Sequence, residues 1–165
     1  MTQEEKELLL KDICARIPYE VIGKCEIDAS YDTSFDTLLQ IHEFDAVVYG
    51  IKEDLLLVTP LIEYEDEQNF AEEEVADGVH ILDFTPYLFP LSSITKKQLF
   101  EVQEILGKNE IKIDDGFLRI VDSDRNVITY LEILAVLEWF YKNHFDINDL
   151  IPKGLAIDAT GLNIY

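Results

Sequence analysis

The sequence is poor in cysteine, glycine and basic residues, and each shortage excludes a class of protein. Two cysteines among 165 residues are too few for a disulfide framework or a four-thiolate metal site. Seven dispersed glycines form neither a GxGxxG motif nor a P-loop. Thirteen lysines and arginines stand against 34 acidic residues, a formal charge of −21, whereas binding to phosphate needs clustered cations. Nucleic acid and an anionic membrane surface are therefore unfavourable direct partners.

Long apolar runs and targeting signals are also missing. The longest uninterrupted apolar run, residues 133–137, is far shorter than the roughly 20 residues of a membrane helix. The first residues, Met1–Glu5, do not begin a basic segment that leads into an apolar one, so we expect no signal peptide. Cys14 and Cys25 are then expected to be reduced, partly buried thiols of a cytoplasmic protein.

Core-forming residues are nevertheless abundant. Hydrophobic residues make up 48% of the chain, which is normal for a globular protein and excludes a wholly disordered acidic chain. A length of 165 residues is typical of a single domain, and no linker rich in Pro, Gly or Ser divides the sequence. We therefore predict one domain over residues 1–165.

Three helices are predicted from a shared start signal, a threonine followed three residues later by Glu or Gln. The pairs are Thr2 with Glu5, Thr95 with Gln98, and Thr129 with Glu132. In such a capping box, each side chain accepts a backbone N–H that would otherwise have no partner. Apolar residues at helical spacing follow each pair, and Gly107 is placed to end the second helix.

The first and third helices differ in how their apolar residues are distributed. The predicted buried stripe of the first helix comprises Leu10, Ile13, Cys14 and Ile17. Pro18 is expected to end that helix. The third helix, residues 129–143, is apolar around nearly its whole circumference, which is typical of a helix packed on several sides. We expect it to be largely buried, as the central element of the core.

Between the first two helices, the hydrophobic pattern changes to that of β-strands. Strand-like runs cover residues 21–27, 37–41, 46–51 and 55–62. Tight connections are predicted at 43–45 and 52–54, which favours an antiparallel meander of about four strands. Residues 112–121 are predicted to form a further hairpin with 126–128. The order of helix, strands and helices indicates an α+β fold.

The segment 63–77 holds eight carboxylates and no cation. One interpretation is a solvated acidic loop or insert, over about residues 63–78, that keeps the protein soluble. The other is a docking surface for a basic protein, in which the charges speed encounter. Such a surface can imitate a phosphate backbone. The candidate partner-binding residues are Glu63, Glu65, Asp66, Glu67, Phe70, Glu72, Glu73 and Glu74.

Asp122, Asp124 and Asn126 have the spacing of the first three ligands of a calcium-binding loop. The pattern then departs from that loop. Val127 stands where a glycine makes the sharp turn, and Glu132 comes one residue too early to be the bidentate ligand. A plain turn is the favoured interpretation, and a divalent-cation site is the alternative.

Each of the three histidines is closely followed by an aspartate, as His144 is by Asp146. A carboxylate can orient an imidazole for metal binding or for base catalysis. The three pairs lie far apart, however, and none has the spacing of a helical zinc motif. Because such pairs arise by chance among 34 acidic residues, we favour structural histidines and keep His144 and Asp146 as site candidates.

Two strings are distinctive: PYLFPLSSIT at 86–95, and NHFD at 143–146 with LIPKGLAI at 150–157. Together with the opening residues 8–19, they resemble a group of small uncharacterised proteins of gut anaerobic bacteria and their phages and mobile elements. The resemblance is loose over 51–82 and supplies no activity or binding residue. It implies a cytoplasmic bacterial or phage setting and an accessory or anti-defence role.

The residues of the second string also have a structural interpretation. Phe145 and Leu150 can fold back onto the preceding helix while Asp146 or Asn148 caps a short turn. This makes the string a packing device, with a ligand site at His144 and Asp146 as the alternative.

We therefore expect an acidic cytoplasmic protein that binds another macromolecule, above all a basic protein, and that needs no cofactor. Within this class it would be a nucleic-acid mimic or a regulatory accessory protein. The alternatives are a divalent-metal-dependent enzyme that uses clustered carboxylates, and a soluble domain without a charged partner. No catalytic residue is predicted, and the sequence leaves the oligomeric state open.

Overall fold

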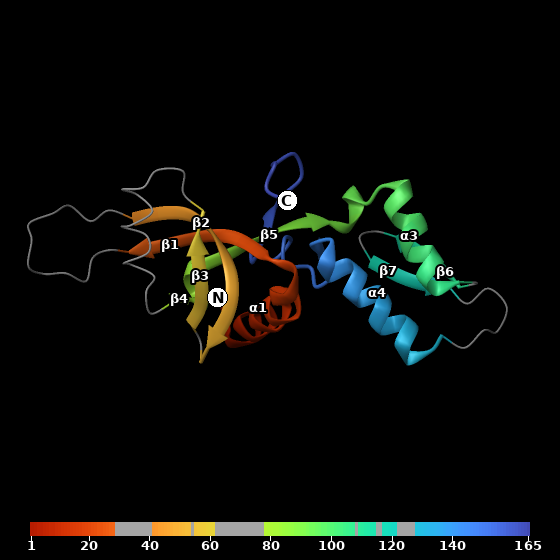
Figure 1. Cartoon of the computed structure of the whole chain (residues 1–165), viewed down its shortest axis with the longest axis horizontal. Coiled ribbons are helices and arrows are strands. Elements are labelled where there is room, and N and C mark those ends of the chain that lie inside the picture. Colours follow the sequence, from red (N-terminus) through yellow and green to blue (C-terminus); the bar gives the residue numbers. More distant parts are fainter. Residues whose placement is uncertain (29–40, 54, 62–77, 108, 115–116, 122–127) are drawn as a thin grey trace, which may run out of the picture. The chain divides into compact units, whose positions relative to one another are not determined.

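The computed structural model describes residues 1–28, 41–53, 55–61, 78–107, 109–114, 117–121 and 128–165 (Figure 1). The chain divides into two units. Unit 1 comprises residues 1–87 and 155–157, and unit 2 comprises 88–154 and 158–165. Helices and a mostly antiparallel sheet make an α+β fold, which confirms the predicted fold class. The prediction of one domain over 1–165 stays a prediction.

Unit 1 consists of a helix followed by a meander of strands. The bounds are α1 Gln3–Arg16, η1 Ile17–Tyr19, β1 Val21–Asp28, β2 Ile41–Lys52, β3 Leu55–Pro60, β4 Val79–His80 and η2 Ile81–Asp83. Strand β5, Phe84–Pro90, begins in unit 1, and its last three residues belong to unit 2. The strands pair antiparallel in the order β4-β3-β2-β1-β5, which confirms the predicted antiparallel sheet. The strands predicted at 37–41 and 46–51 are not separate, because residues 41–52 form the single strand β2, and residues 37–40 lie outside the described residues.

Strand β2 corrects one predicted connection. Residues 43–45 lie inside β2, with Asp45 opposite Lys24 of β1, and do not form a tight connection. Acidic residues are common in turns, but here Glu43 and Asp45 alternate with Phe44 and Ala46, which is the pattern of a strand with one wet face. The connection predicted at 52–54 is confirmed, because β2 ends at Lys52 and β3 begins at Leu55.

All three predicted capping boxes are present. Each threonine accepts the N–H of the residue three positions later, and the side chain of that residue accepts the threonine N–H. The boxes open α1, α3 at Lys96–Leu106 and α4 at Tyr130–Lys142. Gly107 follows α3 with a φ of +60°, a conformation that a glycine adopts without strain.

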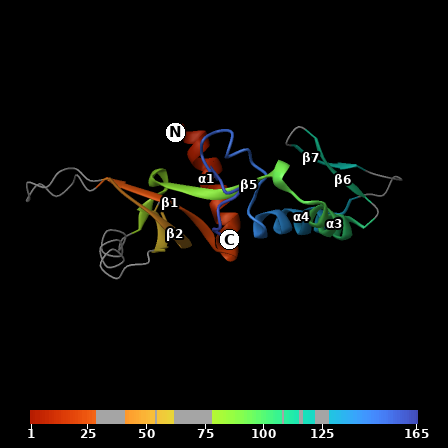
Figure 2. The same cartoon turned by 90° about the horizontal axis from the view of Figure 1, so that it is seen from above.

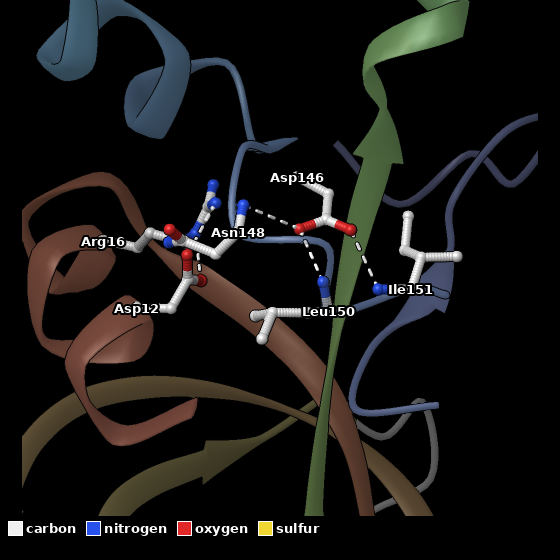
Figure 3. Close-up of polar contacts among 6 residues, drawn as sticks. All are labelled: Asp12, Arg16, Asp146, Asn148, Leu150 and Ile151. Carbon is white, nitrogen blue, oxygen red and sulfur yellow. Dashed lines mark hydrogen bonds and ion pairs between the residues drawn. The ribbon is translucent and has the colours of Figure 1, made fainter. Parts of the chain in front are cut away.

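The buried face of α1 differs from the predicted stripe. Its members are Leu9, Asp12, Ile13 and Arg16, and Cys14 is exposed. Asp12 and Arg16 form an ion pair with both side chains fully buried. Arg16 donates from Nε to Oδ2 of Asp12 at 2.5 Å and from Nη2 to Oδ1 at 3.1 Å (Figure 3). The predicted stripe is confirmed at Ile13 and wrong at Cys14. It admitted only apolar residues, whereas two opposite charges one turn apart can share the buried face.

The sheet of unit 1 has one apolar, buried side. The side chains on this side that are at most 1% exposed include Val21, Cys25, Ala46, Val48 and Phe84. Gly23 lies among them, and a Cβ at this position would stand 2.3 Å from the ring of Phe84. The glycine therefore lets this ring lie directly against β1. Helix α1 lies beside the sheet in both views (Figures 1 and 2).

Unit 2 is built from two helices and a hairpin. Besides α3 and α4, its elements are η3 Leu91–Ser93, β6 Glu110–Asp114, β7 Phe117–Val121 and β8 Phe145–Asp146; β9, Ile157–Asp158, has one residue in each unit. Strand β8 pairs in parallel with the end of β5. The core of unit 2 consists of Leu91, Val102, Leu106, Ile111, Val136, Phe140 and Phe145.

The β6–β7 hairpin corrects the strand predicted at 112–121. The two strands pair antiparallel, with Ile111 opposite Ile120 and Asp114 opposite Phe117. Between them the sequence reads Asp115-Gly116, which is a strong signal for a two-residue hairpin connection. Residues 115–116, like residues 126–127 of the predicted partner, lie outside the described residues.

Helix α4 packs into the core of unit 2 through its second half. Val136 and Phe140 are buried there, and the ring of Trp139 stacks on that of Phe145 at 5.8 Å. The prediction that this helix belongs to the core is confirmed for these turns. The first turns carry exposed hydrophobic residues, beginning with Tyr130 and Leu131, so an apolar sequence on all sides does not bury the whole helix.

The ion pair of α1 gives a test of this packing. Replacing Asp12 with alanine removes the carboxylate that faces a buried guanidinium, and we expect the free energy of unfolding to fall by about 3–5 kcal/mol. The variant Asp12→Leu/Arg16→Met removes both charges and should be more stable than Asp12→Ala. Urea unfolding measures both, with the exposed Lys11→Ala as a control on the same helix. A double variant less stable than Asp12→Ala would contradict this account.

Candidate functional site

Asp146 closes the loop that follows β8. Its Oδ1 accepts the N–H groups of Leu150 at 2.9 Å and Asn148 at 3.3 Å, and its Oδ2 accepts that of Ile151 at 2.8 Å (Figure 3). The residue is buried. Charged acceptors make strong hydrogen bonds to backbone N–H groups, so this carboxylate fixes the path of residues 146–151. The loop is also tied by Lys153, whose Nζ donates to the carbonyls of Asn148 and Asp149 at 3.0 Å each.

His144 turns the chain from α4 into β8. Its backbone has a φ of +56°, a left-handed conformation that is uncommon for a residue with a side chain. Its carbonyl accepts the N–H of Phe89 at 2.9 Å, and its buried ring stacks on that of Tyr165 with centroids 3.7 Å apart. These contacts favour the packing interpretation of the second string. The ligand site at His144 and Asp146 stays a prediction.

The other predicted sites fall mainly outside the described residues. This applies to the partner-binding candidates at 63–74 and to the metal candidates Asp122, Asp124 and Asn126. His80 is described, and its Nδ1 accepts the N–H of Leu82 at 3.2 Å, which caps η2. In the described parts of the chain, no group of three or more His, Cys, Asp or Glu residues could hold a metal ion.

A charged surface lies on the side of the unit 1 sheet opposite the buried one. Strand pairing places Lys24 opposite Asp45, and Glu26 opposite Glu43. The Nζ of Lys24 lies 2.6 Å from Oε2 of Glu43, and both side chains are partly exposed. The hydrogen bond to Glu43, together with the charges of Glu26 and Asp45, raises the pKa of Lys24. We refer to Glu26, Glu43 and Asp45 as the acidic face.

Asp45 connects the acidic face to β5. It accepts the hydroxyl of Tyr87 at 2.7 Å. Burial, the hydrogen bond to Asp45 and the negative charges nearby raise the pKa of Tyr87 above its ordinary value. Sequence reasoning missed this face because it interpreted residues 43–45 as a connection. The signal that could have found it is the alternation of acidic with apolar residues along β2.

The main chain of Asp45 bonds to Leu61, the last residue described before the acidic segment. The N–H of Leu61 donates to the carbonyl of Asp45 at 2.7 Å. The chain then passes into residues 62–77, which lie outside the described residues and contain eight carboxylates. The hydrogen bond therefore holds Leu61, the last described residue before this segment, against β2.

Unit 2 has a small hollow of about 210 Å³. It is lined by Phe89, Ser93, Gln98, Phe145, Thr160 and Gly161. Two of its polar side chains already bond within the fold: Ser93 Oγ donates to the Pro90 carbonyl at 2.8 Å, and Gln98 Oε1 accepts the Thr95 N–H at 2.9 Å. The hollow therefore offers mainly the aromatic rings of Phe89 and Phe145 for contact.

The two thiols lie in different environments. Cys25 is buried on the apolar side of the sheet, and this burial, with the charges of Asp45 and Asp83, raises the pKa of its thiol to about 12. Cys14 is exposed on α1. The prediction of partial burial for both is therefore wrong for Cys14, which follows from the altered buried face of α1.

No family model, curated protein or solved structure matches this chain. Among the described helices, none combines the length and the apolar character needed to span a membrane. The function is therefore inferred from the residues of this chain.

The role of Asp146 can be tested by removing its acceptors. In Asp146→Ala three backbone N–H groups lose their carboxylate, and we expect the free energy of unfolding to fall by roughly 2–4 kcal/mol. Asp158→Ala is the matched control, because Asp158 accepts one N–H, that of Thr160, at an exposed position. Thermal unfolding compares the two variants. Equal stability of both variants would show that Asp146 does not hold the loop.

The different burial of Cys14 and Cys25 predicts how each thiol reacts and how the folding stability changes at alkaline pH. At pH 8, we expect a thiol reagent to modify Cys14 in the folded protein and both cysteines in urea. The folded-state pKa of Cys25 exceeds its ordinary value of 9.0, so the unfolded state releases this proton first. The contribution of the protonated Cys25 thiol to folding stability is therefore fully present below pH 9, and it is lost as the pH rises toward 12.

Cys25→Ala should reduce this alkaline loss of stability, whereas Cys14→Ala should leave it unchanged. Urea unfolding across this pH range measures the effect. Rapid modification of Cys25 in the folded protein would show that the thiol is not buried as described.

Proposed function

We propose that this protein acts by binding a macromolecule with a basic surface, and that unit 1 makes the contact. The uneven distribution of charge along the chain supports this proposal above all. Unit 1 contains 22 of the 34 acidic residues and 5 of the 13 basic ones, a formal charge of −17. Unit 2 contains the remaining 12 and 8, a formal charge of −4. Solubility alone does not require the negative charge to be concentrated in one unit.

The geometry of the acidic face supports a contact made by fixed charges. Glu43 and Asp45 lie two residues apart on one strand, so their Cα atoms are about 6.5–7 Å apart. Pairing with β1 holds Glu26 beside them. Lys24 is the cation among these groups, and it is bonded to Glu43. A row of carboxylates on a rigid strand can imitate a phosphate backbone, which makes a nucleic-acid-binding protein the favoured class of partner.

The electrostatic energy of unit 1 also favours a cationic partner. Like charges at this density repel one another and lower the stability of the folded state. A basic surface removes part of this repulsion when it binds. The same field raises the rate of encounter, and salt screens it over about 8–10 Å. The resemblance to small proteins of phages and mobile elements is compatible with an accessory protein that occupies the basic site of another protein.

The proposal is tested by capture followed by measurement of affinity. The immobilised protein is exposed to a lysate of its native host at low salt, and bound proteins are eluted with a salt gradient and identified by mass spectrometry. The captured protein is then purified, and its dissociation constant is measured at several salt concentrations. We expect a basic protein whose affinity falls steeply as salt increases.

Charge variants test the acidic face and the acidic segment 63–77 separately. One variant is Glu26→Gln/Glu43→Gln, and a second neutralises Glu65, Asp66, Glu67, Glu72, Glu73 and Glu74. The matched control neutralises two exposed carboxylates of unit 2, Glu101→Gln/Glu104→Gln. We expect the dissociation constant to rise about tenfold or more in the first two variants and to change little in the control. Unchanged affinity in both unit 1 variants would refute the proposal.

A further inference from the structure

An open hollow of about 250 Å³ lies beside α3 in unit 2. We refer to it as the α3 hollow. Its lining residues are Lys96, Leu99, Phe100, Gln103 and Ile111. The four residues of α3 recur at spacings of three and four, so their side chains share one side of the helix. Ile111 belongs to β6, which contacts α3, and the hollow is therefore shaped by two elements of the same unit.

The walls of the α3 hollow are held in place by Gln103. Its Oε1 accepts the N–H of Ile111 at 3.2 Å, and its Nε2 donates to the carbonyls of Gly107, at 3.3 Å, and of Asn109. These bonds join the helix to β6, and they use both the oxygen and the nitrogen of the amide. The hollow therefore exists before a ligand binds, which reduces the entropy lost on binding, and Gln103 offers a ligand mainly its hydrocarbon.

The surface inside the α3 hollow is largely apolar. Ile111 is buried, Leu99 is half-buried against the core of unit 2, and Phe100 is 62% exposed. A ring with this exposure still has most of its apolar surface in contact with water. A hydrocarbon ligand that covers the ring removes that surface from water, which is the main source of free energy for binding in such a site.

The charge at the border of the α3 hollow is positive. Lys96 lines the hollow, and among the described residues it takes part in no ion pair and no side-chain hydrogen bond. Residues 84–100 contain no acidic residue, in a chain where 34 of 165 residues are acidic, so the start of α3 lacks the negative charge found elsewhere.

The two carboxylates of α3, Glu101 and Glu104, do not line the hollow. Glu101 lies about 140° around the helix from Lys96, and Glu104 lies about 12 Å from it along the axis. The ammonium of Lys96 is therefore the charge that a ligand in the hollow contacts.

We infer that the α3 hollow binds a small molecule that carries one carboxylate on a hydrocarbon body. The carboxylate pairs with the ammonium of Lys96, and the hydrocarbon lies against Leu99, Phe100 and Ile111. The volume of the hollow is below the roughly 300–1,000 Å³ of sites for drug-sized ligands, so the ligand is compact. This inference is independent of the proposed function, because it concerns unit 2 and a ligand of the opposite charge.

The test uses hexanoate as the probe, with two molecules that each lack one of its features. Hexanamide has the same hydrocarbon without the charge, and acetate has the charge without most of the hydrocarbon. Nuclear magnetic resonance of the ¹⁵N-labelled protein at moderate salt gives both the dissociation constant and the residues whose signals shift. We expect a dissociation constant on the order of 1 mM for hexanoate, with the largest shifts in α3 and β6.

The two comparison molecules measure the two parts of the contact. Hexanamide should bind about twofold to fivefold more weakly than hexanoate, which is the ordinary contribution of an exposed ion pair. Acetate should bind about tenfold or more weakly than hexanoate, because it buries little apolar surface.

Two lysine variants locate the carboxylate of the probe. Lys96→Gln should lower the affinity for hexanoate about twofold to fivefold and leave the affinity for hexanamide unchanged, so that the two probes bind alike. Lys97→Gln is the matched control, since Lys97 is the next residue, is also exposed and does not line the hollow. This control should keep the preference for hexanoate.

Two aromatic variants locate the hydrocarbon of the probe. Phe100→Ser should weaken the binding of hexanoate and hexanamide alike, by about threefold or more. Tyr130→Ser is the matched control, since Tyr130 is 73% exposed on α4 of the same unit and does not line the hollow. Because all four substituted positions are exposed, each variant should keep the thermal stability of the unchanged protein, which circular dichroism checks.

Three outcomes would overturn the inference. The first is the absence of saturable hexanoate binding at α3 and β6 up to about 20 mM, roughly twenty times the expected dissociation constant. The second is equal binding of hexanoate and hexanamide to the unchanged protein. The third is that Lys96→Gln loses no more affinity for hexanoate than Lys97→Gln does. The proposed function is assessed separately, because it depends on the carboxylates of unit 1 and on the captured partner.

Discussion

Repulsion among carboxylates is the constraint on which this structure depends. With 34 acidic and 13 basic residues, most carboxylates must remain in water, and each one that is taken out of water needs its own donors. Asp12 receives two hydrogen bonds from Arg16, Asp45 receives the hydroxyl of Tyr87, and Asp146 receives three backbone N–H groups. The donors are a guanidinium, a phenol hydroxyl and backbone N–H groups. Only one of these three carboxylates therefore uses a basic residue as its donor.

Features that depend on neighbouring residues could be predicted from the sequence. The capping boxes at Thr2, Thr95 and Thr129 need only two side chains three residues apart, and all three formed as predicted. The exposed face of β2 also follows from a local pattern, the alternation of acidic and apolar residues. Acidic residues such as Glu43 and Asp45 are equally common in turns, however, so the composition of this segment does not distinguish a strand from a turn. The Asp12–Arg16 pair could not be foreseen, because nothing in an apolar pattern shows that two charges will be buried against each other.

The candidate surfaces depend on contacts between distant parts of the sequence. The acidic face forms because β1 and β2 pair in one particular register, which sets Glu26 beside Glu43, and these residues are separated by a segment whose length does not fix the register. His144 and Asp146 could be identified as a pair from spacing. Their roles follow from partners such as Tyr165 and Ile151, and only tertiary structure supplies those contacts.

Helix α4 shows where local sequence and tertiary structure disagree, and this disagreement is informative. Its sequence is as apolar at Leu131 as at Phe140, yet only Phe140 is buried. The capping of α4 is decided by residues within the helix, whereas the burial of each turn depends on what the rest of unit 2 places against it.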